Sequence, residues 1–274
     1  FLKQHTDTSM FIRSNLAKTG ITFQDKPYHG DYWGAFDQKA QYQGVLAHYW
    51  NGNIMTQTQS PETLYALLDT FKKTSRRTIK GVLGEQKEVN LVINRLAIPV
   101  QDISLNSKTG LFTLDLDKLI LPEHRDLELI DAKKLDKNLL FDWLKAYDIE
   151  AIGSEDNQET NKMVQEGVER VLSEPDMWAL SYKGTPVSLS GFNARLPDIV
   201  QIGPVWTPPQ HRSKGYARAI VALTLEKART EGVKKAVLFT DSEPAQKAYE
   251  AVGFSRVGDF GITLLKKPLE YNNI

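Results

Sequence analysis

One stretch decides the fold of this chain: Gly203-Pro204-Val205-Trp206-Thr207-Pro208-Pro209-Gln210-His211-Arg212-Ser213-Lys214-Gly215-Tyr216-Ala217. An apolar strand enters a turn marked by prolines, and a helix follows it. The first backbone N–H groups of a helix have no partner inside it and carry the positive end of its dipole, so the turn forms an anion site. Gly215 has no Cβ to keep a phosphate from the backbone. The P-loop and dinucleotide patterns are absent, so the turn predicts a pyrophosphate ligand of another kind.

Pro204 indicates a bulge or a local parting of the strand from a neighbour, because proline cannot donate to a ladder. The unpaired backbone groups of a parted strand need partners, and an extended ligand with its own amides can supply them by strand addition. A ligand with amides along an arm and a pyrophosphate at one end is coenzyme A. Its pantetheine arm would lie along Val205, Trp206 and Thr207. Its pyrophosphate would sit on the N–H groups of Arg212, Ser213, Lys214, Gly215, Tyr216 and Ala217. The alternative is an ordinary solvated loop in which Arg212, Lys214 and Arg218 are surface charges.

A second constellation runs from Ser242 to Phe254, and in it Tyr249 lies one helical turn beyond Ala245 on the same face. A tyrosine hydroxyl can donate a proton to a departing thiolate as a general acid. The alternative is that Tyr249 only packs its helix against the sheet.

Composition limits the classes of protein to which the chain can belong. It has 274 residues, 41% of them hydrophobic, with 34 basic and 34 acidic side chains and no cysteine. The length suits two domains, and the balanced charge gives no general attraction to nucleic acid or to a membrane. Disulfides, thiolate metal sites and cysteine nucleophiles are excluded, and a reducing, cytoplasmic location is expected. No apolar run approaches the roughly 20 residues that span a bilayer. Because the sequence begins at Phe1 rather than at methionine, we expect the natural N-terminus to lie upstream. The first twelve residues do not have the apolar core of a signal peptide.

Periodicity and turn residues predict two domains of similar order, residues 1–122 and residues 123–274, with a boundary near Pro122. In the second domain we expect helices at 135–149, 161–173, 214–231 and 243–252, and strands at 127–130, 178–182, 187–193, 199–207, 236–241 and 254–265. In the first we expect helices at 10–18, 61–73 and 88–96, and strands at 31–36, 44–50, 54–57 and 78–83. The first domain has Thr56-Gln57-Thr58-Gln59-Ser60-Pro61 before its helix, without glycine or basic residue, so it should not bind a pyrophosphate in this way.

The two constellations resemble motifs of the GNAT N-acetyltransferases. Arg212-Ser213-Lys214-Gly215-Tyr216-Ala217 is similar to the family's Arg/Gln-x-x-Gly-x-Gly/Ala motif, and Ala245 to Phe254 resembles its last helix, in the family's order and spacing. The resemblance covers about residues 127–265, and the first domain resembles the degenerate partner of tandem GNAT proteins. It implies an α/β (α+β) fold of two domains. Each would be a mixed, mostly antiparallel sheet flanked by helices, with splayed central strands in the C-terminal one.

The resemblance also implies roles for particular residues. Val205 and Thr207 would contact pantetheine through their backbone, residues 212–217 would hold the pyrophosphate of acetyl-CoA, and Tyr249 would be the general acid. The N–H groups at the splay would polarise the thioester carbonyl. Ser242 stands where many members carry asparagine, which weakens the expected bond to the coenzyme arm. Ser213 stands where glycine is frequent.

These observations predict an acetyl-CoA-dependent N-acetyltransferase acting on a small-molecule or peptide amine by direct attack. A non-catalytic module that binds CoA is the alternative, and a tandem enzyme using aminoacyl-tRNA is a third reading. The general base stays open among Asp241, Glu243, Glu250, a carboxylate of the 149–158 loop and a water relay. The amine and the oligomeric state cannot be read from the sequence.

Other polar clusters predict no further chemistry. The histidines have no metal-ligand spacing and are expected to be structural or exposed: His5, His29, His48, His124 and His211. The basic run Lys72, Lys73, Arg76, Arg77 and Lys80 is expected to be a solvated helix end rather than a nucleic-acid site. The aromatic residues at 32–33 and 48–50 are expected to be core, or to line an acceptor cleft.

Overall fold

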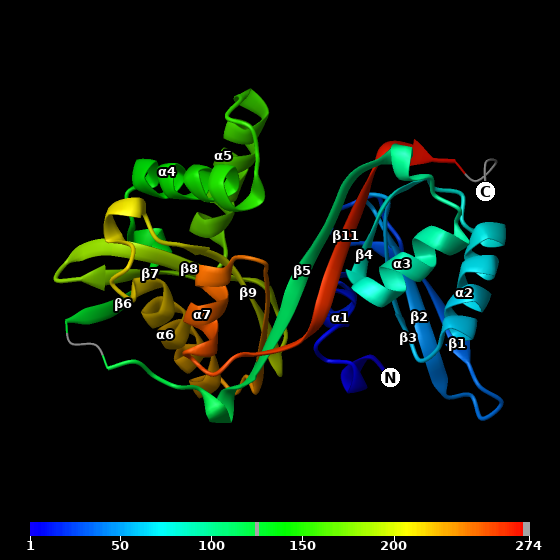
Figure 1. Ribbon diagram of the computed structural model, residues 1–274, viewed down its shortest axis with the longest axis horizontal. Helices are drawn as coiled ribbons and strands as arrows, with labels where there is room; N and C mark the ends of the chain where they lie inside the picture. The colour runs from blue at the N-terminus through cyan, green and yellow to red at the C-terminus, as the bar shows by residue number, and fades with distance from the viewer. Residues whose placement is uncertain (124–125, 271–274) are drawn as a thin grey trace. The chain divides into compact units, whose positions relative to one another are not determined.

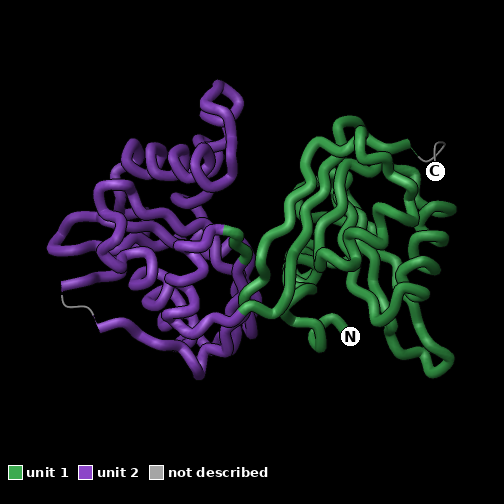
Figure 2. The backbone as a smooth tube through the Cα atoms, viewed as in Figure 1, with its two compact units in different colours: residues 1–112, 239–241, 256–274 green, residues 113–238, 242–255 purple. Residues whose placement is uncertain are grey.

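The chain forms two compact units, each with its own hydrophobic core (Figure 2). The structure is a computed structural model that describes residues 1–123 and 126–270. Unit 1 contains residues 1–112, 239–241 and 256–274, and unit 2 contains residues 113–238 and 242–255.

Unit 1 is a sheet with strand order β1-β2-β3-β4-β11-β5 and helices packed against it (Figure 1). Its elements are α1 (Met10–Thr19), β1 (Gly30–Phe36), β2 (Tyr42–Tyr49), β3 (Asn53–Thr58), α2 (Pro61–Thr74), β4 (Ile79–Glu85), α3 (Gln86–Arg95), β5 (Ile103–Asp115) and β11 (Ser255–Leu269). The ends of the last two strands, 113–115 and Ser255, belong to unit 2. Helix α2 begins at Pro61 with Ser60 as its cap, and it buries the apolar stripe Leu64, Leu67, Leu68 and Phe71 against the sheet.

Strands β3 and β4 of unit 1 are parallel for only three residue pairs and then part. The last pair is Met55 with Leu83, although β3 continues to Thr58. The carboxylate of Glu88, on α3, accepts hydrogen bonds from the Thr58 amide at 2.6 Å, the Thr58 hydroxyl at 2.7 Å and the Thr56 hydroxyl at 2.5 Å. Glu88 is only 6% exposed. An internal side chain therefore supplies partners to the strand where it leaves its neighbour.

Unit 2 repeats this arrangement with strand order β10-β9-β8-β7-β6, and the end of β5 lies next to β10. Its elements are β6 (Leu127–Asp131), α4 (Lys137–Tyr147), a π-helical segment (Asp148–Ile152), α5 (Gln158–Ser173), β7 (Met177–Tyr182), β8 (Thr185–Arg195), β9 (Ile199–Trp206), α6 (Tyr216–Thr230), β10 (Lys235–Thr240) and α7 (Glu243–Glu250). The pairs β6–β7, β7–β8 and β8–β9 are antiparallel, whereas the pair β9–β10 is parallel.

Helices cover both faces of the sheet in unit 2 (Figure 1). Ala179 packs with residues of α4 and α5, whereas its neighbour Leu180 packs with Ala219 and Ile220 of α6. Successive residues of a strand point to opposite faces, so α4 and α5 cover one face and α6 the other.

The predicted fold class is confirmed, including the splayed strands of the C-terminal half. Every expected helix and strand is present, but β5 was not expected, because its sequence is largely polar and carries no clear alternation of buried residues. The division into units also differs from a single cut at residue 122. Residues 113–122 lie in unit 2, and β11, expected to close the second domain, instead pairs with β4 in unit 1 from Phe260–Glu85 to Leu269–Ile79. His124 falls outside the described residues.

Candidate functional site

The parting of β9 from β10 forms the centre of the candidate site. Their parallel pairing covers Ile199–Lys235, Val200–Ala236 and Gln201–Val237, and β9 then runs on to Trp206. On the other side of β9 the register with β8 shifts between Ser190 and Phe192, where Pro204 and a cis Gly203–Pro204 bond occur. The predicted irregularity at Pro204 is thus confirmed. The stretch predicted to hold a pantetheine arm, Val205 to Thr207, lies beyond the last pair with β10.

The turn after β9 collects backbone N–H groups at the start of α6. The first backbone hydrogen bond of that helix joins the Ala219 amide to the Gly215 carbonyl at 2.9 Å. Among the described residues, no backbone hydrogen bond uses the amides of 213–218. Gly215 caps the helix with φ of +79° and Ser213 has φ of +60°, both in the left-handed region. The predicted binding residues 212–217 therefore lie together on one turn, with the geometry of an anion site.

Side chains around this turn are already engaged. Arg212 Nε donates to the Thr207 carbonyl at 2.9 Å, and its guanidinium lies 5.0 Å from the centre of the Trp206 ring. Arg212 Nη2 lies 2.8 Å from the carboxylate of Glu150. Lys214 Nζ donates to the Gln210 carbonyl at 3.2 Å. The strand end is fixed as well, because the buried hydroxyl of Ser188 donates to the Trp206 carbonyl at 2.8 Å.

Tyr249 is buried on α7, the helix that Ser242 caps. Burial, and then the neighbouring Tyr147, raise the pKa of Tyr249 well above the usual value for tyrosine. The hydroxyl therefore stays protonated at neutral pH, as a proton donor must. On the same helix Ala245 is half-buried and Ser242 is exposed. Tyr147, at the end of α4, was not singled out from the sequence, since a tyrosine on the apolar face of a helix usually only packs.

The carboxylates considered as general base differ in their surroundings. Glu243 is exposed and paired with Lys247 at 2.7 Å, and Glu150 is paired with Arg212. Burial raises the pKa of Asp148, which directly follows Tyr147. Asp148 was not among the residues singled out, because one acidic residue at a helix end has no distinctive pattern.

Three buried polar atoms on β8 and β9 have no hydrogen-bond partner among the described residues: Ser190 Oγ, Gln201 Oε1 and Trp206 Nε1. Gln201 is the last residue of β9 paired with β10, and its Nε2 donates to the Ile202 carbonyl at 2.6 Å. Native proteins usually satisfy such groups. Ser190 and Trp206 lie on opposite faces of the sheet, because Trp206 packs with Leu189 and Ser190 is the next residue after Leu189, so these atoms do not form one site.

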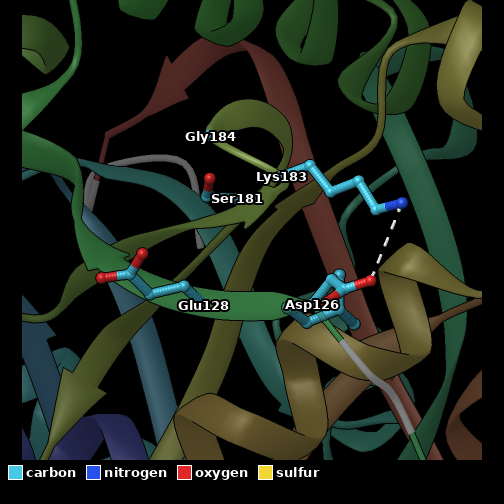
Figure 3. Close-up of a pocket in the computed structure, with 6 residues that line it drawn as sticks. Asp126, Glu128, Ser181, Lys183 and Gly184 are labelled. Carbon is cyan, nitrogen blue, oxygen red and sulfur yellow. Dashed lines mark ion pairs between the residues drawn. The ribbon is translucent and has the colours of Figure 1, made fainter.

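A separate cavity of about 310 Å³ lies beside β6 and the β7–β8 turn (Figure 3). It is lined by Asp126, Leu127, Glu128, Ser181, Lys183 and Gly184, and Lys183 Nζ lies 3.8 Å from Asp126. None of the residues predicted to bind CoA lines it.

Within residues 1–123 and 126–270, no three His, Asp or Glu side chains gather in a way that would hold a metal ion. None of the described helices is both long and apolar enough to cross a bilayer.

Comparison with known proteins connects this geometry to a family. Residues 138–254 match the family model described as acetyltransferase (GNAT) family. No curated protein matches the sequence. The fold is similar to that of a GCN5-related N-acetyltransferase from Kribbella flavida, with TM-score 0.53 and 13% identity over 82% of this chain and 87% of that one.

Two further solved structures are similar over almost the whole chain. A GNAT-family acetyltransferase from Colwellia psychrerythraea has TM-score 0.51 and 16% identity, over 97% of this chain and 96% of that one. A Drosophila protein has TM-score 0.61 and 12% identity, over 96% and 89%. At these identities the likeness shows the fold alone.

Proposed function

With a GNAT domain at residues 138–254 as the premise, we propose that this chain is an acetyl-CoA-dependent N-acetyltransferase acting on a primary amine. The observation that carries the proposal is the splay between β9 and β10, which runs directly into the turn whose amides, 213–218, have no backbone partner. Acetyl-CoA would supply an activated acetyl group as a thioester. The residues present fit its shape, since an unpaired strand edge is followed by an anion site at a helix N-terminus.

The chain's own groups would divide the chemistry between them. Val205, Trp206 and Thr207 would align the arm along β9, and residues 212–217 would bind the diphosphate. Backbone N–H groups at the splay would polarise the acetyl carbonyl, an effect worth roughly 3–4 kcal/mol per donor in acyl transfer. The amine nitrogen forms a bond to the acetyl carbon as the carbon–sulfur bond breaks, and the proton that the nitrogen loses would pass to a general base, either a carboxylate or a water relay. Tyr249, protonated at neutral pH, would give its proton to the leaving sulfur.

Unit 1 would take no direct part in holding the coenzyme. Its parted strand is already bonded to Glu88, and its turn before α2 has Ser60 and Pro61 in place of a glycine-bearing anion site. We propose that unit 1 is a degenerate GNAT-like partner that supports the fold or shapes acceptor access.

Calorimetry and turnover on the full chain test the proposal. CoA and acetyl-CoA should bind, and a panel of primary amines should release CoA thiol. Tyr249→Phe should lower kcat by about a hundredfold or more while the Kd for CoA stays within about twofold, because general acid catalysis contributes 10²–10⁴-fold. The absence of binding at millimolar CoA would refute the proposal. Binding without turnover of any amine, unchanged by the substitution, would indicate a non-catalytic CoA-binding module.

A further inference from the structure

The arginine of the candidate diphosphate turn is held by a segment from another part of unit 2. Arg212 Nη2 contacts both carboxylate oxygens of Glu150, at 2.8 Å and 2.9 Å. The two residues are 62 positions apart in sequence. The side chains are 40% and 52% exposed, so the pair is open to solvent and to competing anions.

Glu150 belongs to the π-helical segment Asp148–Ile152, a departure from regular helix between α4 and α5. The segment ends at Gly153, whose φ is +80°. Residues 150–153 are exposed, and Ile152 is 63% exposed, so little apolar packing holds this part of the chain. Lys145 Nζ lies 2.6 Å from Asp156, which ties the following loop back to α4. Among the described residues, the Arg212 pair is the ionic contact that joins the segment to the β9–α6 turn.

A diphosphate on the 213–218 amides would compete with Glu150 for Arg212. The guanidinium Nε is committed to the Thr207 carbonyl, and Nη2 is committed to Glu150. A phosphate oxygen that approaches Nη2 meets the carboxylate, and like charges at this distance repel. Exposed ion pairs are weak, so a multiply charged ligand that also gains helix amides can displace Glu150.

We infer that Glu150 competes with a bound diphosphate for Arg212, and that its ion pair with Arg212 acts as a latch that holds segment 148–152 against the candidate diphosphate turn. Binding of a diphosphate at this turn releases the segment. The inference rests on the proposed function, since it takes the turn to be the CoA site. The released segment carries Asp148 and follows Tyr147, the neighbour of Tyr249, so occupation of the turn is linked to the helix ends beside the candidate acid.

Calorimetric titration with CoA tests the latch on the full chain. Glu150→Gln removes the charge but keeps the size, and it should tighten CoA binding about two- to fivefold, the value of an exposed pair. Glu155→Gln is the matched control, because Glu155 loses the same charge nearby and has no cation in salt-bridge contact among the described residues. In an Arg212→Gln background, Glu150→Gln should change nothing. Equal tightening in that background would show simple charge repulsion and overturn the latch.

Hydrogen exchange of the peptide covering 148–157 gives a readout that needs no ligand. In Glu150→Gln this peptide should exchange faster than in the unchanged chain or in Glu155→Gln, and saturating CoA should have the same effect on the unchanged chain. Equal exchange in all three proteins without ligand overturns the latch. If CoA fails to bind, the proposed function fails, and the exchange difference between Glu150→Gln and Glu155→Gln still decides whether Glu150 holds the segment.

Discussion

Replacing Glu88 by alanine is expected to lower the free energy of unfolding of unit 1 by about 3–5 kcal/mol. The substitution removes the acceptor of three hydrogen bonds, from the Thr58 amide, the Thr58 hydroxyl and the Thr56 hydroxyl. Bonds to a charged group contribute roughly 1.5–3 kcal/mol each, less than additively, and the buried amide would be left without a partner. Denaturation by guanidinium, followed by circular dichroism, measures the loss.

Glu88→Gln separates the hydrogen bonds from the charge. The glutamine carbonyl can accept from Thr58, and its NH₂ group can donate to the Thr56 hydroxyl, which is free to rotate. Burial outweighs these bonds and raises the pKa of Glu88, so the buried charge itself is a net cost. The neutral variant should therefore lie within about 1 kcal/mol of the unchanged chain at neutral pH.

The pH dependence has a defined sign. The folded state holds the Glu88 proton more tightly than the unfolded state. The free energy of unfolding therefore falls as the pH rises from the usual glutamate pKa to the raised pKa of Glu88. In Glu88→Gln this decrease should be absent, because glutamine does not titrate. Glu166→Ala, on the exposed face of α5, is the control and should change the stability by less than about 0.5 kcal/mol. A loss below about 1 kcal/mol in Glu88→Ala, or an equal loss in both Glu88 variants, would refute the reasoning.

Three further outcomes are expected. Gly215→Glu should abolish CoA binding measured by calorimetry, and unchanged affinity would contradict the assignment of the turn. Gly215→Ala, which must adopt the same left-handed φ but adds no charge, should weaken CoA binding less and lower the free energy of unfolding by about 1–2 kcal/mol. Burial, and then the charge of Arg77, lower the pKa of His48 to about 4. The free energy of unfolding should therefore fall by about 2 kcal/mol as the pH is lowered from 7 to 5. The same decrease in a His48→Gln variant would show that His48 is not its cause. A fragment of residues 123–274 should aggregate, because it lacks 113–122 of unit 2 and carries β11 without β4; a monomeric, well-folded fragment by gel filtration would count against this dependence.

Local features of the sequence were sufficient to predict the turn. Pro204 fixes its own φ and has no N–H, and Gly203 and Gly215 permit backbone conformations that other residues avoid, so these effects can be foreseen without knowing the neighbours. The same holds for α2, where Ser60, Pro61 and the apolar stripe specify a helix start and a buried face.

Contacts between residues far apart in the sequence could not be predicted. The pair Arg212–Glu150 joins residues 62 positions apart, and neither side chain differs in pattern from ordinary surface charge. Glu88 was expected at the start of a helix, yet nothing in its neighbours indicates that its carboxylate is buried. Strand β5 and the pairing of β11 with β4 depend on partners elsewhere in the chain, which periodicity within one segment does not identify.

The two units differ in what partners the backbone where a parallel strand pair ends. In each, a parallel pair of strands parts after three residue pairs, and the backbone beyond needs partners. The third residue of the helix that follows the parallel strand is Glu88 in α3 and Ala245 in α7. In unit 1 the carboxylate reaches Thr56 and Thr58 and completes the strand from within. Alanine at 245 has no group that can do this. Among the described residues, other side chains reach only the carbonyls of Ile202, Trp206 and Thr207, and we propose that the amides of an extended ligand complement the strand further.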